Sequence, residues 1–112
     1  MDIRANTIQA CRLLGVQAYA TPPAERPDEF ATVEVGSGRV KSRVACTAVV
    51  TVTAWAKSEL RAAALAGQLR DGLCQGYTGT LDVSVNANTY SDNDTESGTP
   101  RASFALTVCH RL

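Results

Sequence analysis

The strongest constraint on the fold is a long alternating stretch in the middle of the chain. From residue 44 to residue 56, every even position carries a small or aliphatic side chain: Val44, Cys46, Ala48, Val50, Val52, Ala54 and Ala56. Three of the odd positions between them carry threonine. A period of two is typical of a strand with one buried face and one more polar face. We predict a long strand over residues 39–56, which forms a hairpin with a strand over residues 30–35.

The periodicity changes directly after Trp55. Ser58 is a suitable N-cap, and Glu59 lies where a negative charge favours the first turn of a helix. Apolar residues then recur every three or four positions, at Ala62, Leu65, Ala66, Leu69 and Leu73. Such a stripe predicts a helix that packs one face against the sheet.

The rest of the chain supplies another helix and another hairpin. Apolar spacing predicts a helix over residues 2–14, followed by a short strand over residues 16–20. Two alternating segments, residues 81–88 and 102–109, flank a polar and acidic loop at residues 91–100. Two half-buried strands around such a loop predict a second hairpin.

This order of elements predicts an α+β fold over residues 1–112 as a single domain. We expect an antiparallel sheet of two hairpins plus a short strand, with the N-terminal helix and the long helix packed on one face. Composition agrees, since the 112 residues are 45% hydrophobic and 20% charged. Eleven basic side chains balance eleven acidic ones, so we do not expect specific nucleic-acid binding. No stretch has the ~20 apolar residues of a membrane span, and we expect neither an export signal nor a membrane anchor.

Cysteine and histidine give no sign of catalytic or metal chemistry. The four cysteines lack the close pairs that zinc sites use: Cys11, Cys46, Cys74 and Cys109. Without an export signal, we expect free and mostly buried thiols rather than disulfides. The one histidine, His110, has no visible partner, and the alternation predicts that it covers the edge of the core. We therefore expect no enzyme activity, no metal and no cofactor.

Two segments of opposite charge are candidate contact surfaces. One is a basic arm that carries Arg39, Lys41 and Arg43. The other is an acidic loop, without the complete calcium-loop pattern, that carries Asp92, Asp94 and Glu96. Complementary patches on different surfaces allow copies of a domain to meet head to tail, and such contacts can close into a ring. The six residues are therefore predicted contacts with other subunits or with a partner. Solvated loop tips, or a phosphate contact for the arm, are the alternatives.

Four short motifs resemble one protein family, in the same order along the chain. Residues 26–33, R-P-D-E-F-A-T-V, resemble the R-P-x-x-F-V-x-V start of the small tail terminators of long-tailed bacteriophages. Residues 50–56 resemble the strand of that family that ends in tryptophan before the long helix, and residues 62–69 resemble its alanine-rich helix. Residues 97–104, S-G-T-P-R-A-S-F, resemble its S-G-x-P-R-x-x-F entry to the last strand.

The resemblance implies a structural protein of the virion rather than an enzyme. Such proteins form a hexameric ring at the head-proximal end of the tail tube, stop tube polymerisation and present the surface that joins the head connector. The implied partners are copies of the chain itself, the tail tube protein and the head–tail connector protein, around a lumen that can pass DNA. The implied locations are the tail–neck junction of the virion and, during assembly, the host cytoplasm.

Some features leave other classes open. Ala31 and Ala102 are smaller than the residues expected from the family at these positions, and Ala102 could thin the packing beside Phe104. Another neck protein, such as a stopper or head-completion protein, is one alternative. A small ligand-binding domain is another, and it would need a pocket with converging polar groups.

Overall fold

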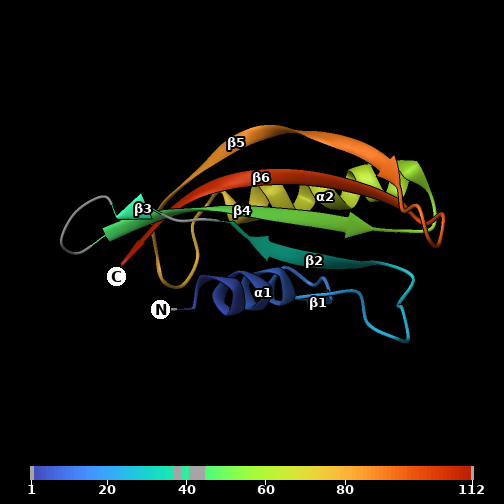
Figure 1. Ribbon diagram of the computed structural model, residues 1–112, viewed down its shortest axis with the longest axis horizontal. Helices are drawn as coiled ribbons and strands as arrows, with labels where there is room; N and C mark the ends of the chain where they lie inside the picture. Colours follow the sequence, from blue (N-terminus) through green and yellow to red (C-terminus); the bar gives the residue numbers. More distant parts are fainter. Residues whose placement is uncertain (1, 37–38, 41–44, 112) are drawn as a thin grey trace.

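Two helices and six strands make up the computed structural model, which describes residues 2–36, 39–40 and 45–111 (Figure 1). In chain order the elements are α1 (Ile3–Leu13), β1 (Ala18–Tyr19), β2 (Phe30–Val35), β3 (Arg39–Val40), β4 (Ala45–Trp55), α2 (Glu59–Leu73), β5 (Thr80–Asn93) and β6 (Pro100–Arg111). The predicted α+β class is confirmed. Ser58 caps α2 as predicted, because its side chain accepts a hydrogen bond from the backbone N–H of Arg61. Within the described ranges, neither helix is long and apolar enough to cross a membrane.

The strands form one sheet in the order β1-β2-β4-β6-β5, and β3 pairs with β4 beside that path. The central pair, β4 and β6, runs antiparallel from Ala45 opposite Arg111 to Trp55 opposite Arg101. At one edge, β1 pairs in parallel with β2, so the sheet is mixed rather than fully antiparallel as expected. The connector over residues 20–29 carries the chain back to the end where β1 begins, and β2 therefore runs in the direction of β1.

The prediction of one continuous strand over residues 39–56 is wrong. The segment Arg39–Val40 folds back and pairs antiparallel with residues 46–47 of β4, which itself begins at Ala45. An alternating pattern can continue on both sides of a reversal, because a period of two gives the face of each residue but not the direction of the chain.

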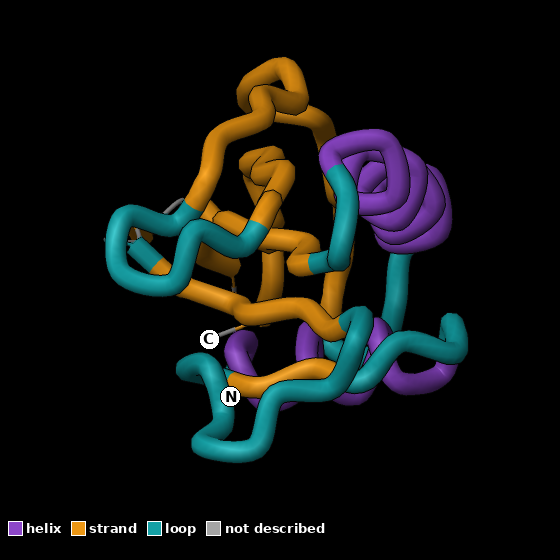
Figure 2. The backbone as a smooth tube through the Cα atoms, turned by 90° about the vertical axis from the view of Figure 1, so that its right-hand side faces the viewer, coloured by secondary structure: helices purple, strands orange, loops and turns teal. Residues whose placement is uncertain are grey.

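One face of the sheet carries the hydrophobic core, as the alternation predicted. Both helices cover this face: α1 contacts β1 and β2, and α2 contacts β4, β5 and β6 (Figure 2). The predicted apolar stripe of α2 is buried along its whole length. The largest fully buried side chains of the core include Leu69, Leu73, Phe104, Leu106, Val50 and Val52. Burial of these apolar surfaces is the main favourable contribution to folding.

The second hairpin differs from its prediction in two ways. The strand β5 continues to Asn93, opposite Pro100, so only residues 94–99 form the loop between β5 and β6. Leu81 and Val85 were expected on a buried face, but they are 51% and 48% exposed. The reason is that β5 is the outermost strand and that its register with β6 shifts at three places, so α2 leaves part of it uncovered.

Candidate functional site

The candidate contact residues lie toward opposite ends of a molecule that is 44 Å long. The acidic residues lie near the turn from β5 to β6: Asp92, Asp94 and Glu96 (Figure 1). At the other end of the sheet, Arg39 lies in β3. Lys41 and Arg43 lie outside the described residues. The sequence alone did not show that the two candidate surfaces lie toward opposite ends of the molecule.

Two of the acidic residues are paired with arginines. Asp92 lies in β5, not in a loop as expected, and it accepts two hydrogen bonds from Arg101 of β6, at 2.8 and 3.0 Å. Asp94 lies 3.6 Å from Arg101 and 4.0 Å from Arg26. Its carboxylate also accepts hydrogen bonds from the backbone N–H and the hydroxyl of Ser97, at 3.1 and 2.7 Å. These interactions fix the turn between β5 and β6 to the end of the sheet.

Both arginines lie over Trp55, the last residue of β4. Their guanidinium carbons are 5.2 Å (Arg26) and 5.3 Å (Arg101) from the centre of the indole ring, within cation–π range. Phe30 of β2 stacks on Trp55, with ring centres 5.4 Å apart and planes inclined by 10°. The indole Nε1 donates a hydrogen bond of 3.1 Å to Oγ1 of Thr32. We refer to Arg26, Phe30, Trp55 and Arg101 as the Trp55 cluster.

The Trp55 cluster lies on the face of the sheet that the helices leave open. Trp55 pairs with Phe30 in the same register that places Thr53 opposite Thr32, away from the core. Trp55 is nevertheless only 4% exposed, because the aromatic and arginine side chains cover it. The open face therefore has its own small buried centre at one end.

The cluster joins motifs that are far apart in the sequence. Two of its residues come from the motif at residues 26–33, one ends the alternating strand, and one comes from the motif at residues 97–104. A hydrogen bond of 3.2 Å from Arg26 to Oγ of Ser97 links the first motif directly to the last. Sequence reasoning gave no site role to the two arginines or to the tryptophan. Only the register of β2, β4 and β6 reveals that they converge.

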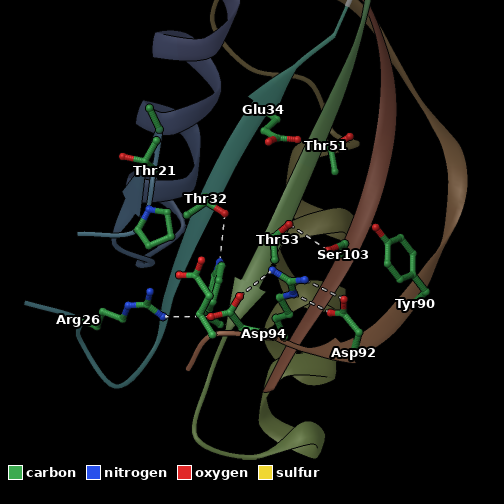
Figure 3. Close-up of a pocket in the computed structure, with 15 residues that line it drawn as sticks. Thr21, Arg26, Thr32, Glu34, Thr51, Thr53, Tyr90, Asp92, Asp94 and Ser103 are labelled. Atoms are coloured by element: carbon green, nitrogen blue, oxygen red, sulfur yellow. Dashed lines mark hydrogen bonds and ion pairs between the residues drawn. The ribbon is translucent and has the colours of Figure 1, made fainter. Parts of the chain in front are cut away.

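Beside the Trp55 cluster, the open face forms a hollow of about 430 Å³ (Figure 3). Its floor consists of hydroxyl-bearing side chains from β2, β4 and β6: Thr32, Thr51, Thr53 and Ser103. The hydroxyl oxygens of Thr53 and Ser103 are 2.9 Å apart and share a hydrogen bond. Tyr90 of β5 lines one side, and Thr21 of the connector after β1 lines the opposite side. The hollow is thus a polar surface with many hydrogen-bonding groups.

The lining of the hollow carries more negative than positive charge. The two arginines of the Trp55 cluster face four carboxylates: Glu34, Asp92, Asp94 and Glu96. Among the ion pairs of the described residues, none involves Glu34 or Glu96. Both side chains belong to exposed residues, so they are the carboxylates that a positively charged partner could reach.

Hydrogen bonds favour the charged forms of Asp94 and Arg101. The hydrogen bonds from Ser97, and then the nearby charges of Arg101 and Arg26, lower the pKa of Asp94 from its usual value of 3.8. The hydrogen bonds to Asp92 are the main cause that raises the pKa of Arg101. Asp94 and Arg101 therefore both carry their charge at neutral pH, as their ion pair requires.

The cysteines and the histidine lie away from the hollow. All four cysteines are within the described ranges and are free, as expected, but only Cys11 is buried, whereas Cys46, Cys74 and Cys109 are half-buried. Burial raises the pKa of Cys11 to about 12, which makes its thiol a poor nucleophile. His110 is buried at the end of β6, at the position that the alternation predicted. Over the part of the chain that the structure describes, no group of three or more His, Cys, Asp or Glu side chains could hold a metal ion.

The open face therefore combines a fixed turn, a floor of hydroxyl groups and a net negative lining. Such a face suits contact with a polar or basic protein surface better than enclosure of an apolar ligand. Comparison with protein-family models and with curated proteins finds no match to this chain.

Proposed function

We propose that this chain is a tail terminator of a long-tailed bacteriophage. It forms a ring that ends the tail tube and joins it to the head connector, and it catalyses no reaction. The observation that carries the proposal is the Trp55 cluster, in which residues from separate family-like motifs contact one another. The motifs thus supply neighbouring parts of one structural unit in this fold, which supports reading them together.

In this proposal, copies of the chain meet head to tail through the two ends of the molecule. Glu34 and Glu96 supply negative charge on the open face that no ion pair of the described residues neutralises, and Arg39 lies in β3 at the far end. An interface that uses two different surfaces lets each copy bind one neighbour on each side, and such an interface closes a ring if the rotation fits. Asp92 and Asp94 act here by holding the shape of the turn through their arginines.

The outer edge of β5 is a second surface for a partner. Leu81, Val85 and Tyr90 are 51%, 48% and 58% exposed along this edge strand. Exposed apolar side chains on a long edge strand favour pairing with another chain. A neighbouring subunit or the tail tube protein would cover this edge in the assembly.

The direct test is assembly with the tail tube. We expect the purified protein, mixed with purified tail tubes, to bind the tube ends as rings in electron micrographs. Light scattering of the protein alone would show whether rings form before they meet the tube. If the protein neither forms rings nor binds tube ends, the proposed function is wrong.

Charge reversal tests the head-to-tail contact within this proposal. Glu96→Arg and Arg39→Glu should each weaken ring assembly at low salt, and the double variant should recover part of it, since the two charges are exchanged. Asp71→Arg is the matched control, because Asp71 is exposed on α2, which covers the opposite face of the sheet from the hollow. Equal assembly of all four variants would remove this contact from the proposal.

A further inference from the structure

A row of hydroxyl-bearing side chains crosses the hollow on the open face. Four residues are successive partners in the register of β2, β4, β6 and β5, and all four line the hollow (Figure 3): Thr32, Thr53, Ser103 and Tyr90. Neighbouring strands lie about 4.8 Å apart, so the side chains of the row start at that interval. The register of the strands therefore holds these groups in fixed relative positions.

Two hydroxyl protons of this row have no acceptor among the described residues. Oγ1 of Thr32 accepts the hydrogen bond from Trp55, but it donates its own proton to no described group. Thr53 and Ser103 share one hydrogen bond, which uses one of their two protons. Thr32 and Ser103 are only 9% and 4% exposed, and a buried donor without an acceptor costs free energy. The floor of the hollow therefore requires acceptor oxygen atoms above it.

The walls of the hollow require the opposite, hydrogen-bond donors. Glu34 lies beside Thr51 in the register of β2 and β4, and Glu96 lines the hollow from the turn after β5. Both glutamates are exposed, and neither takes part in an ion pair within the part of the chain that the structure describes. Ionised carboxylates only accept hydrogen bonds. A matching ligand must therefore accept hydrogen bonds at the floor and donate them at the walls.

A sugar without charged groups meets both requirements, because each of its hydroxyl groups donates and accepts. The excess of carboxylates in the lining would repel an anionic ligand, and an ammonium group cannot accept a hydrogen bond from the floor. A peptide backbone pairs with the free edge of a sheet, whereas this hollow lies on a face. Tyr90 is 58% exposed, and its ring offers a surface on which the C–H groups of a sugar can pack.

We propose that the hollow is a binding site for neutral sugars of one or two rings. Oxygen atoms of the sugar accept hydrogen bonds from Thr32 and from the pair of Thr53 and Ser103, and its hydroxyl groups donate to Glu34. The volume of about 430 Å³ lies within the range of ligand pockets, about 300–1,000 Å³. This role goes beyond the proposed function and does not depend on it, because a single copy of the chain contains the whole site.

The first test is saturation-transfer NMR on the unaltered protein. The probes are glucose, galactose, mannose and N-acetylglucosamine, which differ in the arrangement of their hydroxyl groups. Glucuronate and Nα-acetyl-lysine amide are the charged comparisons. We expect transfer to at least one neutral sugar, with an affinity at least about tenfold higher than that of glucuronate, since the lining repels a carboxylate. Absence of transfer to all four neutral sugars would overturn the proposal. Tighter binding of the lysine derivative would also overturn it and would indicate a site for a basic protein segment.

The second test removes hydroxyl groups from the floor and keeps the fold. The double variant Thr53→Val, Ser103→Ala removes both partners of one hydrogen bond, which leaves no buried group unpaired. We expect the Kd for the sugar to rise about tenfold, which corresponds to the loss of about one hydrogen bond, with a nearly unchanged urea midpoint.

Thr107→Val is the matched control for the double variant. Thr107 is a half-buried threonine on the same face of β6, but it does not line the hollow, so its loss should leave the Kd unchanged. Undiminished sugar binding by the folded double variant would show that the hydroxyl row does not hold the ligand. Ring assembly should persist in both variants, because neither changes a proposed subunit contact, so the two proposals can fail separately.

Discussion

The two faces of the sheet use the same alternating strands in different ways. On the covered face, aliphatic side chains of β2, β4 and β6 pack under both helices. On the open face, the intervening threonines and serine line a polar hollow, and only its end is buried, by the Trp55 cluster. The covered face resembles the core of any small domain, whereas the open face carries the polar and charged groups that a partner could contact.

The two faces therefore contribute differently: the covered face contributes mainly to folding stability, and the open face supplies the surface for recognition. Apolar burial of about 25 cal/mol per Å² makes the covered face the main source of folding free energy. The open face is held by ion pairs and cation–π contacts, which are individually worth about 1 kcal/mol or less when partly exposed. The effects of substitutions on the two faces should therefore differ in size and in kind. A substitution on the covered face should cause loss of the fold, whereas one on the open face should cause loss of a fixed surface.

The largest effect is expected for Phe104→Ala on the covered face. Phe104 is fully buried in the core, and truncation of a buried phenylalanine costs about 3–5 kcal/mol. Urea unfolding followed by circular dichroism would measure the loss. The comparison is Tyr90→Ala on the open face, where the side chain is 58% exposed and the cost should stay below about 1 kcal/mol. Similar losses for both variants would contradict the division between the faces.

The covered face is also the part that sequence reasoning predicts well. Burial of one side of a strand or helix imposes a period of two or of 3.6 on the sequence, and that is why the stripe from Ala62 to Leu73 and the even positions of β4 were found. The error at β5 has the same origin. The alternation of Leu81 and Val85 is that of a half-buried strand, but only the width of the helix layer decides whether an edge strand is covered.

The open face was predicted poorly because its contacts are not local. The arginines over Trp55 come from a connector and from β6, and no periodicity relates them to one another. The count of acidic residues along the chain also overstated the number of carboxylates without an ion-pair partner near this turn, because Asp92 and Asp94 have arginine partners.

A smaller effect is expected for Arg101→Met in the Trp55 cluster. The change removes the two hydrogen bonds to Asp92 and the cation over Trp55, so we expect a loss of about 1 kcal/mol. Because Trp55 is the only tryptophan, its fluorescence should change in the folded state as well. The control is Lys57→Met, which removes an ion pair with Asp28 between side chains that are each 77% exposed. If the fluorescence of Arg101→Met matches that of the unaltered protein, the contacts of Arg101 do not hold this end of the open face in a fixed shape.

The smallest effect is expected for the acid dependence of Asp94. Its pKa is lowered in the folded state, so its ionised form stabilises the fold above pH 3.8, and this contribution is lost as the pH falls below that value. Asp94→Asn keeps an oxygen that can accept from Ser97 but removes the charge. The difference in urea midpoint between the two proteins should therefore be largest near neutral pH and shrink on acidification, whereas Asp71→Asn provides the baseline for an exposed carboxylate on the helix side. A difference that is constant with pH would mean that Asp94 shapes the turn by hydrogen bonding alone, without its charge.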